Sequence, residues 1–374
     1  MKKILIFYAS YGGGHLSAAK SIKNFIDENY TDFDSEMIDC MKYISKPIEK
    51  ITTEAYREMA KKTPKLWGKV YFNSEKGVVS KFTRDSNKLM AQKLNHLIRE
   101  RNPDLIISTH PFSSQMCSYL KKKGKLDCKL ATILTDFAIH NQWLIGHEYT
   151  DYFFISNDNM KNDMINYGIN AKKIHITGIP MSNHFVEKFD KNEIYNYFNL
   201  SPNKKTILFF GGGEFGLGKS KTVKILKVFI EALQDFQIVA IAGKNKSMKS
   251  YFEQLVEYTK SSDRVKILGF TDKVPELMHI SNIVVSKPGG LTTTETLSCE
   301  LPMIIINPIP GQEEENANFL VKNGAAVWIK TLEDTQKVID DIFFNSNKLN
   351  IMKENSKKLS KKNSTKKICE ILLN

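Results

Sequence analysis

Short apolar segments alternate with longer amphipathic ones along most of this chain of 374 residues. The apolar segments are rich in Ile, Val and Leu on both faces, which is typical of strands buried in a parallel sheet. A first series of strands is predicted at 3–9, 104–108, 129–135, 152–156 and 174–177, and a second at 206–210, 237–242, 265–268, 283–286 and 303–306. Helical patterns lie between them, for example over 15–28, 85–101, 220–234 and 247–261. The alternation predicts an α/β fold with two parallel sheets.

A polar, proline-containing stretch separates the two series. It spans residues 178–205 and contains Pro180, Pro202 and the sequence NLSPNKK. We therefore predict an N-terminal domain over residues 1–185 and a C-terminal domain over residues 200–347, each built on a Rossmann-like sheet of about five strands. A basic amphipathic insertion at about residues 42–84 interrupts the first series, and a basic helix over 348–374 is expected to return to the N-terminal domain.

The positive charge of the chain is concentrated in two blocks. The formal net charge is +13, of which residues 42–99 carry +9 and residues 348–374 carry +6. Two local patches of this kind indicate an anionic partner, either nucleic acid or a membrane surface. No segment reaches about 18 consecutive apolar residues, so a transmembrane helix is not expected. The apolar run at the N-terminus predicts a buried strand and not a signal peptide.

The cysteines form neither a metal-binding nor a disulfide pattern. There are five of them, widely spaced, with no C-x-x-C pair and no zinc-type Cys/His spacing. They indicate free thiols in a reducing cytoplasm, and no metal site is predicted.

Glycine-rich turns follow three of the predicted strands, at the strand ends where parallel α/β folds bind ligands. The first turn contains Gly12, Gly13 and Gly14 and leads through His15 into a helix. Glycines allow close approach of the backbone, and the start of a helix favours negative charge. His15 is a candidate general base at the mouth of this turn, although it equally suits a plain helix cap.

The second turn, over residues 211–220, reads GGGEFGLGKS. From Gly213 to Ser220 it matches the phosphate-loop pattern of nucleotide hydrolases, between a strand and a helix as that pattern requires. Such an enzyme also needs a downstream strand that ends in an aspartate for Mg²⁺. The later strands end instead in AGK, GFT and SKP, so a phosphate-loop hydrolase is the disfavoured rival.

The third turn, SKPGGLTTTE over residues 286–295, opens another helix. Backbone N–H groups at residues 290–292 and the threonine hydroxyls there would form a phosphate nest. Glu295, about one helical turn in, could reach a ribose diol, or could simply favour the helix dipole. The segment PIPGQEEEN at 308–316 offers amides and carboxylates for sugar hydroxyls, or a solvated helix start.

Taken together, these segments resemble one family. The matching segments occur along this chain in the same order as in that family. They are GGGHLSAA (12–19), PDLIISTHP (103–111), TDFAIHNQW (135–143), TGIPMSNHF (177–185), FFGGGEFGLG (209–218), AGKN (242–245), GFTDKVPELM (269–278), SKPGGLTTTE (286–295) and PGQEEENA (310–317). The chain is similar to glycosyltransferases of family 28, the family of monogalactosyldiacylglycerol synthases and processive diacylglycerol glucosyltransferases. The resemblance implies a GT-B fold, in which two Rossmann-like domains face each other across a cleft.

The resemblance further implies a UDP-sugar donor bound without a metal or other cofactor. Gly212, Gly213 and the helix start at Gly290–Thr292 would hold the diphosphate, Phe270 would lie near the uracil, and Glu295 would take the ribose hydroxyls. Gln312 and Glu313 would take those of the sugar. The full implied donor set is Gly14, Gly212, Gly213, Glu214, Lys244, Phe270, Lys287, Gly289, Gly290, Leu291, Thr292, Glu295, Gln312, Glu313 and Asn316.

By the same resemblance, a hydroxyl of diacylglycerol displaces UDP with inversion, which requires one general base. His15 is our first choice and Asp136 the second. The basic segment would lie peripherally on anionic lipids at the cytoplasmic face of the cell membrane, with apolar groups buried and cations at the headgroups. Trp67, Trp143, Lys61, Lys62 and Lys65 are the expected acceptor and membrane residues.

The sequence is also compatible with other reactions and with one other class of function. The expected reaction is glucosyl transfer to diacylglycerol. Galactosyl transfer to diacylglycerol, or N-acetylglucosaminyl transfer to a polyprenyl-linked acceptor, would use similar residues. A nucleic-acid binder is disfavoured because no helix-turn-helix, zinc or RNA-binding signature accompanies the basic blocks.

Overall fold

The computed structural model describes the chain except residues 11–12, 45–77, 213–217 and 346, and of residues 78–89 it describes the backbone alone. The chain divides into two compact units. The first comprises Met1–Ser182, Pro310–Gln312 and Asn363–Asn374, and the second comprises Asn183–Ile309 and Glu313–Lys362. Most of the basic insertion predicted at residues 42–84 lies outside the described residues.

The first unit is built on a sheet of six parallel strands in the order β2-β1-β3-β4-β5-β6. These are β1 (Lys2–Tyr8), β2 (Phe33–Asp39), β3 (Leu105–Ser108), β4 (Lys129–Ile133), β5 (Tyr152–Ile155) and β6 (Ile174–Ile176). The five predicted strands are present, and β2 was missed. Its sequence, FDSEMID, lies at the sheet edge and is only partly buried, so it lacks the apolar run that marks an interior strand.

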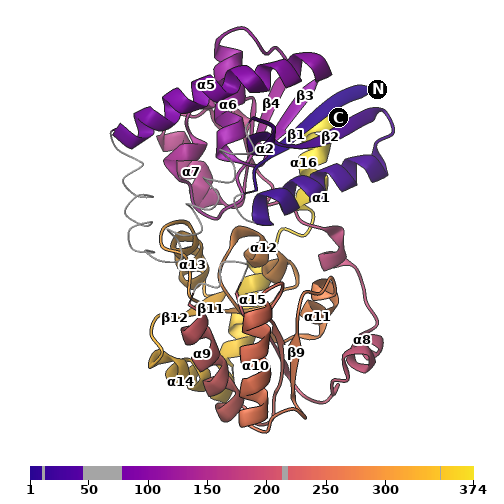
Figure 1. The fold of residues 1–374 in the computed structure, drawn as a ribbon, viewed down its shortest axis with the longest axis vertical. Helices are drawn as coiled ribbons and strands as arrows, with labels where there is room; N and C mark the ends of the chain where they lie inside the picture. The colour runs from indigo at the N-terminus through magenta and orange to yellow at the C-terminus, as the bar shows by residue number, and fades with distance from the viewer. Residues whose placement is uncertain (11–12, 45–77, 213–217, 346) are drawn as a thin grey trace. The chain divides into compact units, whose positions relative to one another are not determined.

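Helices cover both faces of this sheet. They are α1 (Gly13–Asn29), α2 (Cys40–Ile44), α5 (Val78–Arg101), α6 (Pro111–Lys122), α7 (Asp158–Asn166) and α16 (Ser364–Leu373), with short 3-10 turns η1 (Asn141–Trp143), η2 (His147–Tyr149) and η3 (Ala171–Lys173). Leu94 of α5 and Met116 of α6 pack in one apolar cluster, and Ile22 of α1 packs with Ile368 of α16 in another. Figure 1 shows α16, the last helix, beside α1.

The second unit contains another sheet of six parallel strands, in the order β12-β11-β10-β7-β8-β9. These are β7 (Thr206–Phe210), β8 (Gln237–Ile241), β9 (Val265–Leu268), β10 (Ile283–Ser286), β11 (Met303–Ile306) and β12 (Ala326–Ile329). The five predicted strands are present again, and again the missed strand, β12, lies at the sheet edge. Its sequence, AVWI, is apolar and as long as β10 and β11, so a strand could have been predicted there.

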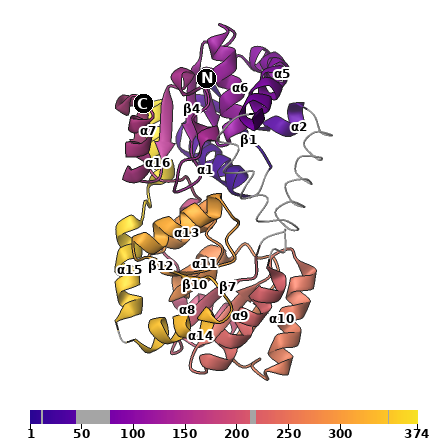
Figure 2. The ribbon, with the colours of Figure 1, turned by 90° about the vertical axis from the view of Figure 1, so that its left-hand side faces the viewer.

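The helices of the second unit are α8 (Lys191–Phe198), α9 (Lys219–Ala232), α10 (Lys246–Tyr258), α11 (Val274–Ile280), α12 (Gly290–Ser298), α13 (Gln312–Lys322), α14 (Asp334–Ile339) and α15 (Lys348–Leu359), with a 3-10 turn η4 (Asn183–Val186) and a π-helical segment η5 (Asp340–Phe344). Helix α9 packs against α10 and α14 (Figure 2). Phe229 of α9 and Phe252 of α10 bury their rings against Phe209 of β7. None of the helices that the structure describes combines the length and apolar character needed to cross a bilayer.

Strand order places a switch point in each sheet. In the first, β2 lies on one side of β1 and β3 on the other; in the second, β8 and β10 flank β7 in the same way. Loops leaving two strands at such a point diverge to opposite faces and leave a crevice at the carboxyl ends. The turn at His15 follows β1, and the turns at Gly212 and Gly289 follow β7 and β10. The fold therefore puts all three glycine-rich turns at switch points.

Candidate functional site

His15 lies in the first turn of α1, beside the residue that follows β3. Its Nδ1 is 2.7 Å from the carbonyl oxygen of Thr109 and 3.0 Å from Oγ1 of Thr135. A carbonyl oxygen can only accept, so we assign the imidazole proton to Nδ1. This tautomer leaves the lone pair on Nε2. Thr109 also donates its hydroxyl to the carbonyl oxygen of His15 at 2.9 Å, which fixes the helix start against the end of β3.

Two further histidines gather around His15. The ring of His110 lies edge-on to that of His15 with centroids 4.5 Å apart, and His140 lies 5.8 Å from the ring of Trp143. Trp143 in turn is 6.3 Å from His15. The sequence analysis missed His110 and His140 as site residues. Both stand in loops that follow the carboxyl ends of β3 and β4, the next two strands after β1 in the sheet, and that position was the available signal.

Burial keeps this histidine cluster neutral. Desolvation lowers the pKa of His15 to about 4 and that of His140 to about 3. It also lowers the pKa of His110 well below its ordinary value, to which the neighbouring imidazoles add. The backbone N–H of Phe112 donates to Nδ1 of His110 at 3.2 Å, so the proton of His110 is on Nε2. At pH 7 all three rings are uncharged, and His15 can accept a proton at Nε2.

Asp136 follows β4 and is 1% exposed. Its backbone carbonyl accepts from the hydroxyl of Ser156 at 2.9 Å, which holds the loop against the end of β5. Its Oδ1 accepts from Nε2 of Gln312 at 2.6 Å; Pro310–Gln312 groups with the first unit. Two predicted site residues, Asp136 and Gln312, are thus brought together.

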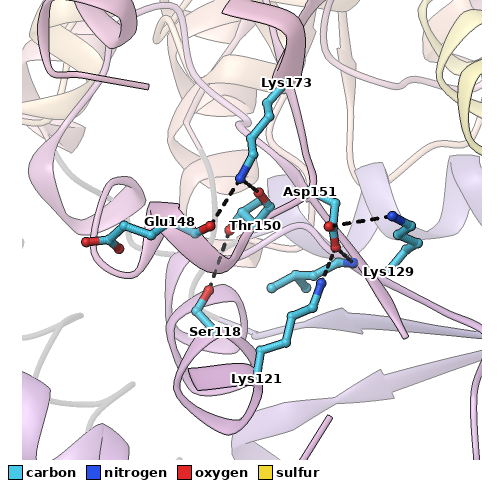
Figure 3. A network of polar contacts seen from close by, with 8 residues as sticks. Ser118, Lys121, Lys129, Glu148, Thr150, Asp151 and Lys173 are labelled. Atoms are coloured by element: carbon cyan, nitrogen blue, oxygen red, sulfur yellow. Dashed lines mark hydrogen bonds and ion pairs between the residues drawn. The ribbon is translucent and has the colours of Figure 1, made fainter. Parts of the chain in front are cut away.

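Trp143 lies on the loop between β4 and β5, and a polar network secures the far end of that loop (Figure 3). Asp151 accepts from the backbone N–H of Leu130 at 2.8 Å and pairs with Lys121 of α6. Lys173 donates to the carbonyl oxygen of Thr150 at 2.7 Å. The loop is thereby tied to α6 and to the turn before β6, and Trp143 itself is 1% exposed. Because it is buried, Trp143 packs beside the histidine cluster and exposes almost no side-chain surface with which to contact a membrane.

The turn after β7 requires its glycines. Gly211 donates its N–H to Ile241 at 2.8 Å, and a Cβ there would come within 2.7 Å of the ring of Phe252. Gly212 has a φ of 100°, a conformation that side-chain-bearing residues rarely adopt. Gly213 and Glu214, also predicted for the donor, lie outside the described residues.

The turn after β10 is joined to the start of α13. Nζ of Lys287 lies 3.3 Å from Oε1 of Glu313, whose Oε2 accepts from the N–H of Ile309 at 2.7 Å. A Cβ on Gly289 would come within 3.9 Å of the same carboxylate. The amide of Asn316, which is fully buried, donates to the carbonyl oxygen of Pro288 at 3.1 Å. Lys287, Gly289, Glu313 and Asn316 therefore form one corner of the second unit.

Helix α12 begins at Gly290, so the first-turn N–H groups of Gly290, Leu291 and Thr292 lie at its positive end. Glu295 is in the second turn of this helix. Burial raises the pKa of Glu295 to about 8, so its carboxyl is protonated at pH 7. A neutral carboxyl can both donate and accept a hydrogen bond, which suits a diol.

Lys244 and Phe270 approach each other beyond the ends of β8 and β9. The Lys244 ammonium lies 5.3 Å from the centroid of the Phe270 ring, and Phe270 is 70% exposed. An exposed aromatic ring at the carboxyl end of the sheet is available for stacking. Gly14 is in the first turn of α1. Trp67, Lys61, Lys62 and Lys65, predicted for the acceptor and membrane, lie outside the described residues.

Comparison with known proteins bears on both units. The family model "Monogalactosyldiacylglycerol (MGDG) synthase" matches residues 15–181, and "Glycosyltransferase family 28 C-terminal domain" matches residues 206–368. A processive diacylglycerol beta-glucosyltransferase of Bacillus licheniformis is 31% identical over 98% of this chain and 93% of its own. One of Staphylococcus epidermidis is 33% identical over 100% of this chain and 92% of its own.

Solved structures share the fold. MurG of Acinetobacter baumannii superposes with a TM-score of 0.69 at 13% identity and covers 99% of both chains. A UDP-GlcNAc 2-epimerase from Neisseria meningitidis, bound to UDP-GlcNAc, superposes with a TM-score of 0.66 at 14% identity over the whole of both chains. The predicted fold class, two Rossmann-like units of the GT-B type, is confirmed.

Proposed function

Because the chain belongs to glycosyltransferase family 28, together with the processive diacylglycerol β-glucosyltransferases, we propose that it transfers glucose from UDP-glucose to diacylglycerol. The observation that carries this proposal is the similarity to those enzymes over nearly the whole of both chains. Each glycine-rich turn also lies at the carboxyl end of a strand at a switch point, where this type of fold binds ligands.

The donor binds in the second unit without a metal ion. Its diphosphate lies on Gly212 and on the first-turn N–H groups of α12, where backbone donors and the helix dipole supply the positive potential. Glu295 takes the ribose hydroxyls, and the uracil lies near Phe270. Gln312 and Glu313 take the hydroxyls of the sugar. Lys287 contributes indirectly, since its pairing with Glu313 sets the orientation of that carboxylate.

The acceptor is activated by His15. A hydroxyl of diacylglycerol gives its proton to Nε2, its oxygen forms the new bond to the anomeric carbon, and UDP leaves with the electrons of the broken bond. A single displacement of this kind inverts the anomeric centre. The hydrogen bond from Nδ1 to Thr109 supports this role, because it holds the tautomer in which Nε2 is free of a proton. Asp136 is the second choice for the base.

The phosphate-loop alternative gains nothing from the structure. The lysine of that pattern, Lys219, donates to Ser247 and lies 3.9 Å from the centroid of the Tyr251 ring, both on α10. Two alternative reactions differ from the main proposal only in a substrate: one uses galactose as the donor sugar, and the other uses a polyprenyl-linked acceptor. The enzyme acts peripherally at the cytoplasmic face of the membrane, with the basic segment 42–99 on anionic lipids.

The proposal is tested by incubating the protein with diacylglycerol and either UDP-glucose or UDP-galactose, and separating the lipids by chromatography. We expect a glycolipid with UDP-glucose and a much smaller yield with UDP-galactose. A phosphate-loop hydrolase would instead release phosphate from ATP or GTP and form no glycolipid. Preference for UDP-galactose would replace the proposed donor and keep the reaction type.

A further inference from the structure

A cavity of about 440 Å³ lies in the second unit at the opposite end of the sheet from the glycine-rich turns. Lys205, Asn282 and Leu301 line it, and they lead into β7, β10 and β11, which are neighbours in the sheet. Gly212 and Lys287 instead follow the carboxyl ends of β7 and β10. Parallel strands all begin at one edge of a sheet, so this cavity is separate from the proposed donor site.

Positive charge dominates the cavity. Lys191, Lys204, Lys205, Lys353 and Lys362 line it, with Glu300 as the one carboxylate among its lining residues. Helices α11 and α12 end here and contribute about half a negative charge each, which is less than the excess of the lysines. Lys353 and Lys362 come from the basic block at residues 348–374, so part of that block faces this cavity.

The pKa of Glu300 reflects the positive potential in the cavity. It pairs with Lys362 at 2.7 Å. The hydrogen bond from Lys362, together with the charges of Lys362, Lys357 and Lys353, lowers the pKa of Glu300 below its ordinary value. One carboxylate thus satisfies one lysine, and the remaining lysines of the cavity are available to a second anion.

An unpartnered hydroxyl lies in the same cavity. Ser298, the last residue of α12, lines the cavity and is 2% exposed. Its Oγ is buried and has no hydrogen-bond partner among the residues that the structure describes. A buried polar group without a partner is unfavourable, so such a group in a native fold calls for an occupant that completes it. A ligand oxygen that accepts from Ser298 would do so.

We propose that this cavity binds a phosphate group, carried either by a small phosphorylated molecule or by a phospholipid headgroup. Lysine ammonium groups are point charges that bind phosphate oxygens without demanding a fixed geometry, and the serine hydroxyl adds one directed donor. The site does not rest on the proposed transferase function, because it shares no residue with the donor or acceptor machinery.

The test uses the full chain saturated with UDP, so that the proposed donor site is filled, and titrates it with inorganic pyrophosphate by calorimetry. Wild type is expected to bind. The double variant Lys204→Gln, Lys353→Gln is expected to lose affinity by about tenfold or more, since it removes two charge-assisted hydrogen bonds to the phosphate oxygens. Ser298→Ala is expected to weaken binding with unchanged thermal stability.

A matched control removes two lysines elsewhere in the same unit. Lys227→Gln, Lys249→Gln changes the net charge equally, at exposed ion pairs on α9 and α10, and pyrophosphate affinity should stay near wild type. Absence of binding in wild type, or equal loss in both double variants, would overturn the proposal. Failure of UDP itself to bind would count against the proposed function. The comparison of pyrophosphate affinity between the two double variants would still test the cavity.

A second arm separates the two sources of phosphate. Vesicles of phosphatidylcholine with and without phosphatidylglycerol are sedimented with wild type and both double variants. Loss of binding to the anionic vesicles only in Lys204→Gln, Lys353→Gln identifies a lipid headgroup. Unchanged vesicle binding, with pyrophosphate affinity lost, identifies a soluble phosphorylated molecule. If neither pyrophosphate nor vesicle binding responds to this variant, the cavity is not a phosphate site.

Discussion

At the scale of single residues, the most informative contact is the hydrogen bond from Nδ1 of His15 to the carbonyl oxygen of Thr109. A histidine in an ordinary surface environment would be half protonated near pH 6.5, and its neutral form would populate two tautomers. Here burial removes the charged form, and the carbonyl selects the tautomer. The same two effects make His15 available as a base over the whole neutral range.

His15→Ala should lower kcat by about 10²–10⁴ with little change in the affinity for UDP, because it removes the general base and no donor contact. Steady-state kinetics with UDP-glucose and diacylglycerol measure this. Since the pKa of His15 is lowered to about 4, wild-type kcat/KM should stay level from pH 7 to pH 5 and decline only as the pH approaches the pKa of His15. Near wild-type turnover in His15→Ala, with loss of activity in Asp136→Asn, would reverse the two assignments.

The histidine cluster also makes the stability of the first unit depend on pH. Between pH 6.5 and about 4, the unfolded chain binds protons on His15, His110 and His140 that the folded chain does not, so the free energy of unfolding falls as the pH falls. Each histidine contributes a slope of up to about 1.4 kcal/mol per pH unit. Denaturant unfolding of His140→Gln across this window should show a smaller slope than wild type.

The control for this slope is His184→Gln. The His184 side chain is 69% exposed and pairs with Glu187. Its replacement should leave the contribution of the histidine cluster to this slope unchanged. If His140→Gln has the same slope as wild type, the buried rings do not titrate as described.

At the scale of elements, the turn after β7 depends on one backbone conformation. Gly212→Ala should cost about 1–3 kcal/mol of stability or shift the turn, because alanine disfavours its φ of 100°. Gly168 after α7 has a φ of 101° and, like Gly212, open space around its Cα, so Gly168→Ala carries the same strain in the other unit. Calorimetry should show weaker UDP binding in Gly212→Ala alone. Equal UDP affinity in the two variants would exclude a role for this turn in binding.

The sequence predicted the interior strands and the turns that follow them, because strands buried on both faces carry an unbroken apolar pattern. It failed at β2 and β12, each at one edge of its sheet, whereas β6 and β9 at the opposite edges were predicted. The sequence of β2, FDSEMID, has no apolar run, but AVWI of β12 is as apolar as the predicted strands and was overlooked. It also missed His110 and His140. Their proximity to His15 depends on the order of the strands in the sheet, which the local hydrophobic pattern does not predict. Asn316 was predicted as a donor ligand from its motif; in the structure its amide supports the turn at Pro288.

At the scale of the whole molecule, the distribution of charge along the sequence identifies two basic blocks but not the structural surroundings of each. The C-terminal block contains two helices, α15 in the second unit and α16 in the first. Ile368 and Cys369 of α16 are part of the core of the first unit, and Lys353 of α15 lines the cavity of the second. A count of charges along the chain cannot distinguish these environments, because they depend on which face of each helix is buried.

The block at residues 42–99 is the one that we expect on the membrane. Sedimentation with vesicles should show stronger binding to anionic than to neutral lipid, and added salt should weaken it, since each Lys or Arg near such a surface contributes about 1 kcal/mol. Lys61→Gln, Lys62→Gln, Lys65→Gln should reduce anionic binding, whereas Lys227→Gln, Lys249→Gln should not. Equal binding to neutral and anionic vesicles would refute the electrostatic part of this prediction.

The proposed reaction is one displacement, without a metal, that moves glucose from UDP-glucose to diacylglycerol. The most direct measurement is the proton NMR spectrum of the glycolipid formed from UDP-glucose, whose sugar is α-linked, in the presence of excess EDTA. We expect glucosyldiacylglycerol with a β anomeric linkage and undiminished yield. An α linkage, or no glycolipid until a divalent metal is restored, would contradict it.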